Sequence, residues 1–255
     1  MADRLPEYRQ LLKDILERGY RFVPMADFAA ALRKGTRPAG HVALLRVDVD
    51  SDPWGARRMF EAERALGIRA TYYFRLSTID RALIAEMVGH GTEVGYHFEE
   101  ASTLARRRGL RSAAEVERYR SALREEFKAN LLLFRKRAGV SPRTAAGHGD
   151  FLNRKLGLSN TFFVDRALLD QSGLVAEAYE AWLVKQISAR IADRPPPQNW
   201  HPKPPHEVLE RRPAVMSLVV HPRQWVRSPS ANARADLERI WAEAEYRVSV
   251  LRRSR

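Results

Sequence analysis

The feature of this sequence that most constrains its fold is a regular alternation between short apolar runs and longer amphipathic stretches. The first strong strand is predicted at residues 41–49, where an apolar run ends in Asp-Val-Asp-Ser-Asp-Pro. Helical spacing of apolar residues follows at 54–66, a strand at 70–75, a helix at 80–88 and a strand at 92–98. Strands that alternate with helices in this way indicate βα units and a parallel sheet.

The alternation continues toward the C-terminus, and a helical segment precedes it at residues 1–40. The remaining expected elements are helices at 5–18, 26–34, 113–138 and 231–246, and strands at 143–147, 162–164 and 214–220. Residues 194–206 are expected to form a proline-rich loop. We find no internal repeat and no linker, so residues 1–255 are predicted to form one α/β domain, most economically a barrel.

Composition narrows the class of protein. A hydrophobic fraction of 45% over 255 residues supplies a substantial core, so disorder is not expected. Cysteine is absent, which excludes disulfides, thiolate metal sites and a cysteine nucleophile. The N-terminal residues lack the apolar region of a secretory signal, and no stretch approaches the roughly 18 apolar residues of a membrane span. These features predict a cytoplasmic protein without a membrane partner.

The formal charge of +13 comes almost entirely from arginine. The basic residues are scattered, with small clusters at 106–108, 211–212 and 252–255, and none alternates with aromatic residues as a stacking platform for bases would. We therefore predict no nucleic-acid partner and attribute most of the excess to arginine-rich codon usage. An anionic substrate, such as a sugar with a phosphate or carboxylate, stays open. Nothing in the sequence indicates an oligomeric state.

Polar residues stand where several predicted strands end. Asp48 and Asp50 end the first strand, and their spacing of two directs both carboxylates to one face. His97, His148 and His221 each end a later strand. Because catalytic groups of parallel α/β folds collect at the carboxyl edge of the sheet, we expect these side chains to meet there.

Such a set supports metal-assisted hydrolysis. A divalent cation held by carboxylate and imidazole polarises an acyl oxygen and acidifies water near neutral pH. A second carboxylate can accept the proton of water, and a histidine can protonate the leaving group. Zn²⁺ suits a mixed shell of this kind, with Co²⁺, Ni²⁺ and Mn²⁺ as alternatives. Walker, dinucleotide-binding, Gly-x-Ser-x-Gly and His-Glu-x-x-His motifs are absent, which removes the commonest kinase, dehydrogenase, serine-hydrolase and metalloprotease interpretations.

The run Leu-Leu-Arg-Val-Asp-Val-Asp at 44–50 resembles the first motif of the NodB-type polysaccharide deacetylases, a carbohydrate esterase family 4-like superfamily, and in particular their "LRHDVD" branch. The similarity continues at 56–61, 66–75, 89–99, 147–149 and 218–222. The resemblance implies a distorted (β/α)₇ barrel in which Asp48 is the general base and His221 the general acid. Asp50 and His97 would be metal ligands. The implied reaction is removal of an N-acyl group, most simply N-acetyl, from a sugar-containing or small natural-product intermediate.

Two positions depart from that pattern. The branch has histidine where Val47 stands, and the commoner second motif, His-x-x-x-His, would place a ligand at Ala101. The third ligand must come from elsewhere, and His148 is favoured over Glu99 and Glu100 because it ends a neighbouring strand. Glu99 is also a catalytic candidate. The alternative is an incomplete site, in a metal-free pseudo-enzyme or ligand-binding protein on the same fold.

Several other residues have weaker expectations. Arg46 shares a strand face with Asp48 and could orient it. Trp200 and Trp225 fit a sugar-binding wall or core packing equally well. The remaining histidines at 90, 201 and 206 are expected to be structural or exposed.

Overall fold

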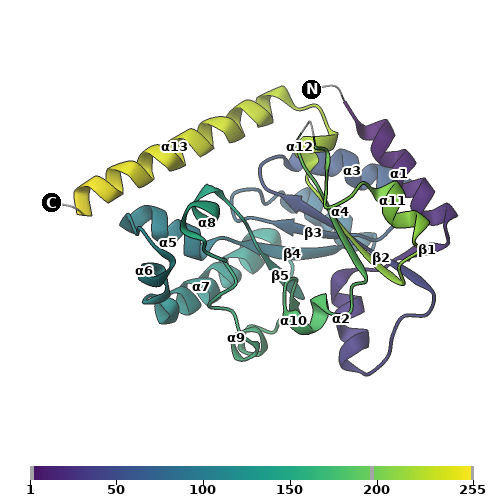
Figure 1. The fold of residues 1–255 in the computed structure, drawn as a ribbon, viewed down its shortest axis with the longest axis horizontal. Helices are drawn as coiled ribbons and strands as arrows, with labels where there is room; N and C mark the ends of the chain where they lie inside the picture. The colour runs from purple at the N-terminus through teal and green to yellow at the C-terminus, as the bar shows by residue number, and fades with distance from the viewer. Residues whose placement is uncertain (1–2, 196–197, 254–255) are drawn as a thin grey trace.

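The computed structural model describes residues 3–195 and 198–253, and in them a curled nine-stranded sheet is surrounded by helices (Figure 1). The strands are β1 (Tyr20–Phe22), β2 (His41–Val49), β3 (Thr71–Phe74), β4 (Glu93–Phe98), β5 (Thr144–Gly147), β6 (Ala176–Glu177), β7 (Ala189–Asp193), β8 (Trp200–His201) and β9 (Val215–Val220). The helices are α1 (Leu5–Glu17), α2 (Met25–Arg33), α3 (Pro53–Ala65), α4 (Arg81–Gly89), α5 (Glu100–Arg108), α6 (Ala113–Glu117), α7 (Arg120–Ala138), α8 (Phe151–Leu156), α9 (Arg166–Gln171), α10 (Ala181–Val184), α11 (Pro205–Glu210), α12 (Pro222–Trp225) and α13 (Pro229–Arg253).

Seven of the strands form an open parallel barrel. Their spatial order is β6-β5-β4-β3-β2-β9-β7, and every neighbouring pair in this series is parallel. The order follows the chain around the barrel, since β9 closes back onto β2. No pairing joins β6 to β7 in the described residues, so the barrel is open between them. This confirms the predicted α/β class and the distorted (β/α)₇ barrel.

Strand β2 is the centre of the sheet, and all of its residues after His41 are buried. Leu45, Val47 and Val49 pack with the large apolar cluster that also includes residues of the surrounding helices, such as Phe60 of α3 and Phe127 of α7. Because strand side chains alternate between faces, the residues between them point to the barrel interior.

The inner face of β2 changes from apolar to polar along the strand. Val42 and Leu44 pack against α2, which closes the amino end of the barrel with Met25 and Phe28. The next inner residues are the buried Arg46 and Asp48, and the strand ends there. One strand thus carries both the floor of the barrel and the charged groups nearest its carboxyl-end mouth.

Long helix α13 lies outside the barrel and runs along one edge of the molecule, beside α5 and α8 (Figure 1). Tyr246 is its one fully buried large side chain, and its hydroxyl donates to the carbonyl of Leu110. The Tyr246 ring also contacts Phe151 of α8 edge-on. These contacts hold α13 above the carboxyl-end side of the barrel.

Four sequence expectations need correction. The helix expected at 113–138 consists of two helices, α6 and α7, which are separated at residues 118–119. The apolar spacing continues across this break, so the sequence did not show it. Residues 162–164 form a turn ahead of α9 rather than a strand. The 1–40 segment includes β1, which pairs with the start of β2. Within 194–206, two residues pair with β7 as β8 and α11 begins at Pro205, while residues 196–197 lie outside the described part.

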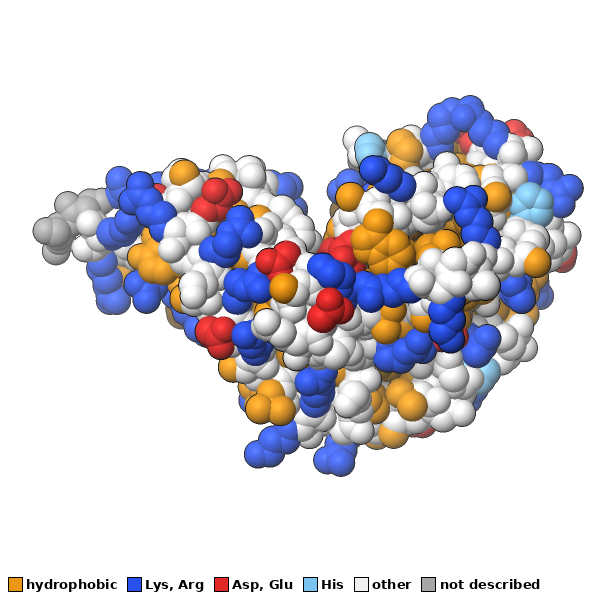
Figure 2. Space-filling view, turned by 90° about the horizontal axis from the view of Figure 1, so that it is seen from below, with side chains coloured by type: hydrophobic (Ala, Val, Ile, Leu, Met, Phe, Trp, Pro, Cys, Tyr) orange, Lys and Arg blue, Asp and Glu red, His pale blue; other side chains and the backbone are white. Residues whose placement is uncertain are grey.

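None of the helices in the described residues is long and apolar enough to cross a bilayer. The basic side chains are dispersed over the face of the molecule shown in Figure 2, with acidic side chains among them, rather than gathered into one patch.

Candidate metal centre and catalytic pocket

Three predicted residues converge at the carboxyl end of the barrel. Asp50 directly follows β2, His97 lies in β4, and His148 directly follows β5. The Oδ1 atom of Asp50 lies 3.3 Å from Nε2 of His97 and 3.6 Å from Nε2 of His148. The three ligand atoms all lie within 4.8 Å of one another, so these side chains could hold one metal ion.

The spacing of these atoms fits a cation of the size of Zn²⁺. Ligand atoms placed tetrahedrally about 2.1 Å from an ion stand roughly 3.4 Å apart, close to the two Asp50 distances. The Oδ1 atom of Asp50 is buried and has no hydrogen-bond partner among residues 3–195 and 198–253. A buried carboxylate oxygen without a partner is costly, so the atom that faces both histidines is the one at which a cation would fit best.

The ring of His97 is oriented to present a lone pair. Its Nδ1 lies 2.9 Å from the carbonyl oxygen of Ala146, which can only accept, so Nδ1 carries the proton. Nε2 then faces Oδ1 of Asp50 and, at 3.5 Å, Oδ2 of Asp48. An imidazole nitrogen turned toward two carboxylates is the arrangement expected of a ligand when a cation lies between them.

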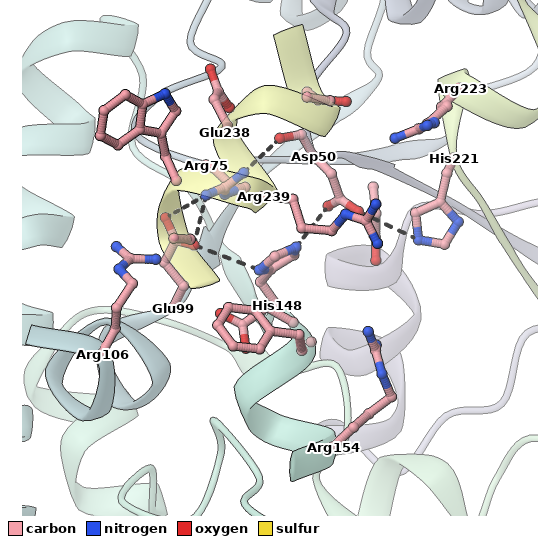
Figure 3. A pocket seen from close by; sticks show the side chains of 18 of the residues that line it. Asp50, Arg75, Glu99, Arg106, His148, Arg154, His221, Arg223, Glu238 and Arg239 are labelled. Atoms are coloured by element: carbon pink, nitrogen blue, oxygen red, sulfur yellow. Dashed lines mark hydrogen bonds and ion pairs between the residues drawn. The ribbon is translucent and has the colours of Figure 1, made fainter. Parts of the chain in front are cut away.

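The carboxylate of Glu99 lies on the side of His148 that faces away from Asp50. Oε2 of Glu99 lies 3.6 Å from Nδ1 of His148. Glu99 is in turn held by Arg75, whose Nη2 donates to both of its oxygens at 3.0 and 2.8 Å. Nη1 of Arg75 also donates to the backbone carbonyl of Asp50. The structure therefore places Glu99 behind His148, beside the metal-facing atoms rather than among them (Figure 3).

Asp48 is fixed by a buried two-point ion pair with Arg46. Nε and Nη2 of Arg46 each donate to one oxygen of Asp48 at 2.7 Å. Burial raises the pKa of Asp48, but the charges of Arg46 and His97 outweigh it and hold this pKa below its ordinary value of 3.8. The carboxylate is therefore ionised and has one orientation.

Aromatic rings enclose the Arg46 guanidinium. It lies 5.0 Å from the ring centre of Tyr73 and 4.7 Å from that of Tyr179, within cation–π range. Gly95 makes room for the Tyr73 ring, since a Cβ there would approach a ring carbon to 2.3 Å. The sequence expectation that Arg46 orients Asp48 agrees with this geometry.

His221 faces the same centre from β9. Its Nε2 lies 3.8 Å from Oδ2 of Asp50, and its Nδ1 is 2.6 Å from Oδ1 of Asp193, at the end of β7. Oδ2 of Asp193 accepts from the backbone nitrogen of His221 and from the indole of Trp225. Burial lowers the pKa of His221, but Asp193 and then Asp50 and Asp48 raise it to about 10. The ring is thus a protonated donor at neutral pH.

Asp50 remains ionised in these surroundings. Burial raises its pKa, but His148, His97 and His221 together hold the pKa well below 3.8. Except for His97, which lies beneath the surface, all the predicted catalytic and metal-facing residues line one cavity of about 1160 Å³. Figure 3 shows Asp50, Glu99, His148 and His221 around this cavity.

The two departures from the family pattern do not affect the centre. Val47 is fully buried with its side chain in the outer apolar cluster, on the strand face opposite Asp48. A histidine there would not extend into the cavity. Ala101 packs in the same cluster. Glu100, one of the three alternatives for the third ligand, accepts from Tyr96 and Asn130 in the core and does not join the metal-facing group.

Two residues that position the site were missed by the sequence analysis. Asp193 ends β7, a short and partly polar strand that was not predicted. Arg75 directly follows β3, and the sequence analysis identified only the strand there. Trp225 is buried and packs against Trp200 rather than lining the cavity, and the tryptophan that does line it is Trp241 of α13.

Comparison with known proteins returned solved structures only. No protein-family model matches the sequence, and no curated protein matches it. The deacetylase PplD of Streptococcus pyogenes is similar over 71% of this chain and 70% of its own, with 14% identity and a TM-score of 0.43. The BpsB deacetylase domain of Bordetella bronchiseptica matches over 83% and 84%, with 16% identity and a TM-score of 0.45.

A third structure, BA3943 of Bacillus anthracis, is described as a CE4 family pseudoenzyme; it matches over 80% of this chain and 61% of its own, with 14% identity and a TM-score of 0.44. These structures are of the deacetylase type that the sequence motifs resemble. With TM-scores below 0.5 the likenesses add nothing to that resemblance, and the barrel is defined by the pairing of the chain's own strands.

Proposed function

We propose that this protein is a metal-dependent hydrolase that removes an N-acyl group, most simply acetyl, from a sugar-containing or small natural-product substrate. The observation that supports this most directly is the unpartnered Asp50 oxygen facing His97 and His148 at ligand spacing. These three residues would hold a divalent cation, with Zn²⁺ the first candidate and Co²⁺, Ni²⁺ or Mn²⁺ the alternatives. When bound, such a cation polarises the acyl oxygen and acidifies the attacking water.

The chain supplies a base and an acid on either side of that position. Asp48, held by Arg46, accepts a proton from the water that attacks the amide carbon. Because its pKa is raised to about 10, the His221 ring carries a proton on both nitrogens: Nδ1 donates to Asp193, and Nε2 delivers its proton to the departing nitrogen. The carbon–nitrogen bond breaks, and a carboxylic acid and a free amine leave.

The test measures both the metal content of the protein and the release of acetate. The purified full-length chain should retain about one divalent ion and release acetate from N-acetylated sugars. Asp50→Asn and His148→Ala should lose both, while His206→Ala, at an exposed histidine of α11, should change neither. Asp48→Asn should keep the metal and lower kcat by roughly 10²–10⁴-fold. A chain that holds no stoichiometric metal and loses no activity in Asp50→Asn would refute the proposal.

A second candidate is a binding protein on the same fold that no longer turns over substrate. The Arg46–Asp48 pair favours it, because both Asp48 oxygens already accept from Arg46 and the lowered pKa weakens this carboxylate as a base. Calorimetric titration of the metal-free chain separates three cases. Weak or absent metal binding indicates a metal-free binder, whereas micromolar or tighter binding with no acetate release indicates a metal-loaded binder. Micromolar binding together with acetate release identifies the enzyme.

A further inference from the structure

The cavity over the metal-facing residues is larger than the reacting group requires. Ligand sites commonly measure about 300–1000 Å³, and this cavity reaches about 1160 Å³. Its outer wall comes from helices that stand outside the barrel, namely α5, α8, α12 and α13. The substrate therefore has room to extend well beyond the acyl group, toward α8 and α13.

Most acidic side chains of this wall already have a structural role. Asp52 and Asp150 accept from backbone nitrogens at the starts of α3 and α8. Glu238 pairs with Arg234, and Glu245 pairs with Arg106. Together with the pairs described above, these contacts leave the carboxylates of the wall with little capacity to neutralise further cations.

Four arginines that line the cavity have no such partner among the described residues, namely Arg154, Arg194, Arg239 and Arg252, and the first and third of these extend toward its centre. Arg154 of α8 and Arg239 of α13 line the cavity and make no hydrogen bond or ion pair with any residue in the described ranges. By contrast, Arg223 on the same wall is held by Asp236. Figure 3 shows the heads of Arg154 and Arg239 directed into the cavity from different helices. Two unpaired guanidinium groups directed into one cavity repel each other unless an anion joins them.

An aromatic ring accompanies these cations. Trp241 lies two residues after Arg239, lines the cavity and is 73% exposed. A large exposed indole on a cavity wall provides a flat apolar face, which suits the face of a sugar ring. The wall thus offers charge for an oxyanion and a surface for a ring on one side of the reacting centre.

We propose that the substrate is an acylamino sugar bearing an oxyanion group, phosphate or carboxylate, which Arg154 and Arg239 bind. Guanidinium groups form strong, charge-assisted and often two-point hydrogen bonds to both kinds of group. The identity of the reacting bond rests on the proposed function, whereas the anion site rests on the two arginines alone. The two statements can therefore fail separately.

The direct test is ligand binding by the full-length chain after chelator treatment, so that no metal contributes. Calorimetry measures the binding of three ligands: N-acetylglucosamine, N-acetylglucosamine 1-phosphate and N-acetylmuramic acid. At least one anionic sugar should bind tenfold or more tightly than the neutral one, and the stronger of the two identifies phosphate or carboxylate. Arg154→Gln and Arg239→Gln should each weaken anionic binding about tenfold and leave neutral binding unchanged. Equal affinity for neutral and anionic sugars would overturn the proposal, as would full anionic binding by the double variant.

Arg247→Gln is the matched control, because Arg247 is an exposed arginine of the same helix that does not line the cavity. It should bind all three ligands like the unmodified chain. Asp50→Asn distinguishes a failure of the proposed hydrolysis from a failure of the proposed anion site. If this variant binds the anionic sugar and no form of the protein releases acetate, the proposed hydrolysis fails and the anion site stands. If the metal-loaded protein releases acetate from neutral and anionic sugars with equal kcat/KM, the anion site fails and the hydrolysis stands.

Discussion

Glu63 of α3 offers a sharp test of the packing behind the barrel, because it is a fully buried carboxyl that makes no ion pair among the described residues. Its Oε1 accepts from the hydroxyls of Tyr8 and Tyr72 at 2.5 and 2.7 Å, and its Oε2 has no partner among the described residues. Burial outweighs these two hydrogen bonds and raises the pKa of Glu63 from 4.5 to about 8. The folded protein therefore holds this group protonated at neutral pH, whereas the unfolded chain does not.

The consequence for stability has a definite sign. Between pH 4.5 and 8 the folded state binds one more proton at Glu63 than the unfolded state, so stability falls as the pH rises through this range. At 1.36 kcal/mol per pKa unit, the loss from this group approaches about 3 kcal/mol at pH 7 relative to acid conditions. Glu63→Gln keeps the acceptor for both tyrosines and removes the titration, so its stability should lack this component.

Urea unfolding at several pH values between 5 and 8 measures this difference. The free energy of unfolding of Glu63→Gln relative to the unmodified chain should rise by about 2–3 kcal/mol from pH 5 to pH 7. Glu61→Gln, at an exposed position of the same helix, should give no such trend. A difference between Glu63→Gln and the unmodified chain that stays constant across this range would refute the reasoning, because it would mean that the buried carboxyl does not take up a proton on folding.

Three further predictions concern the site and its support. Asp193→Asn removes the charge that raises the pKa of His221, so activity should fall more at pH 8 than at pH 6 in a pH–rate profile. Arg46→Met leaves Asp48 buried without its ion-pair partner and should lower the unfolding free energy of the metal-free chain by about 3–5 kcal/mol. A smaller loss in the double variant Arg46→Met/Asp48→Ala would attribute the cost to the stranded charge. Phe127→Ala empties a site enclosed by three aromatic rings and should cost about 3–5 kcal/mol in urea unfolding with activity per folded molecule retained.

The sequence predicted the centre of the barrel well because the relevant information is local there. The apolar run at 41–49 is long enough to identify a buried strand, and its alternation places Asp48 on the inner face. The histidines at 97, 148 and 221 follow or end their own strands. In a parallel sheet those ends share one edge, so the positions of these residues along the sequence were enough to predict that they lie close together.

Other elements could not be predicted because tertiary contacts define them. Strand β6 has only two residues, and β7 is short and partly polar, so neither has a periodicity that separates it from a loop. Their neighbours β5 and β9 supply the hydrogen bonds that make them strands. Asp193, which orients the proposed acid, was missed for that reason. The cavity wall formed by α13 is also invisible in the sequence, since nothing local shows which strand ends a terminal helix will lie above.

The third metal-facing residue shows why spacing along the chain is a weak guide to whether a site is complete. The family pattern places a ligand one helical turn after His97, and alanine stands there, which suggested a defective centre. In space, the requirement is only an imidazole nitrogen about 3.4 Å from the Asp50 oxygen, and any element whose end reaches that point can supply it. Here β5 pairs directly with β4, so the residue after β5 lies beside His97, and the ring centres of His97 and His148 are 5.1 Å apart. Completeness of such a centre is therefore a property of neighbouring strand ends, and a gap in one motif can be filled by the next strand of the barrel.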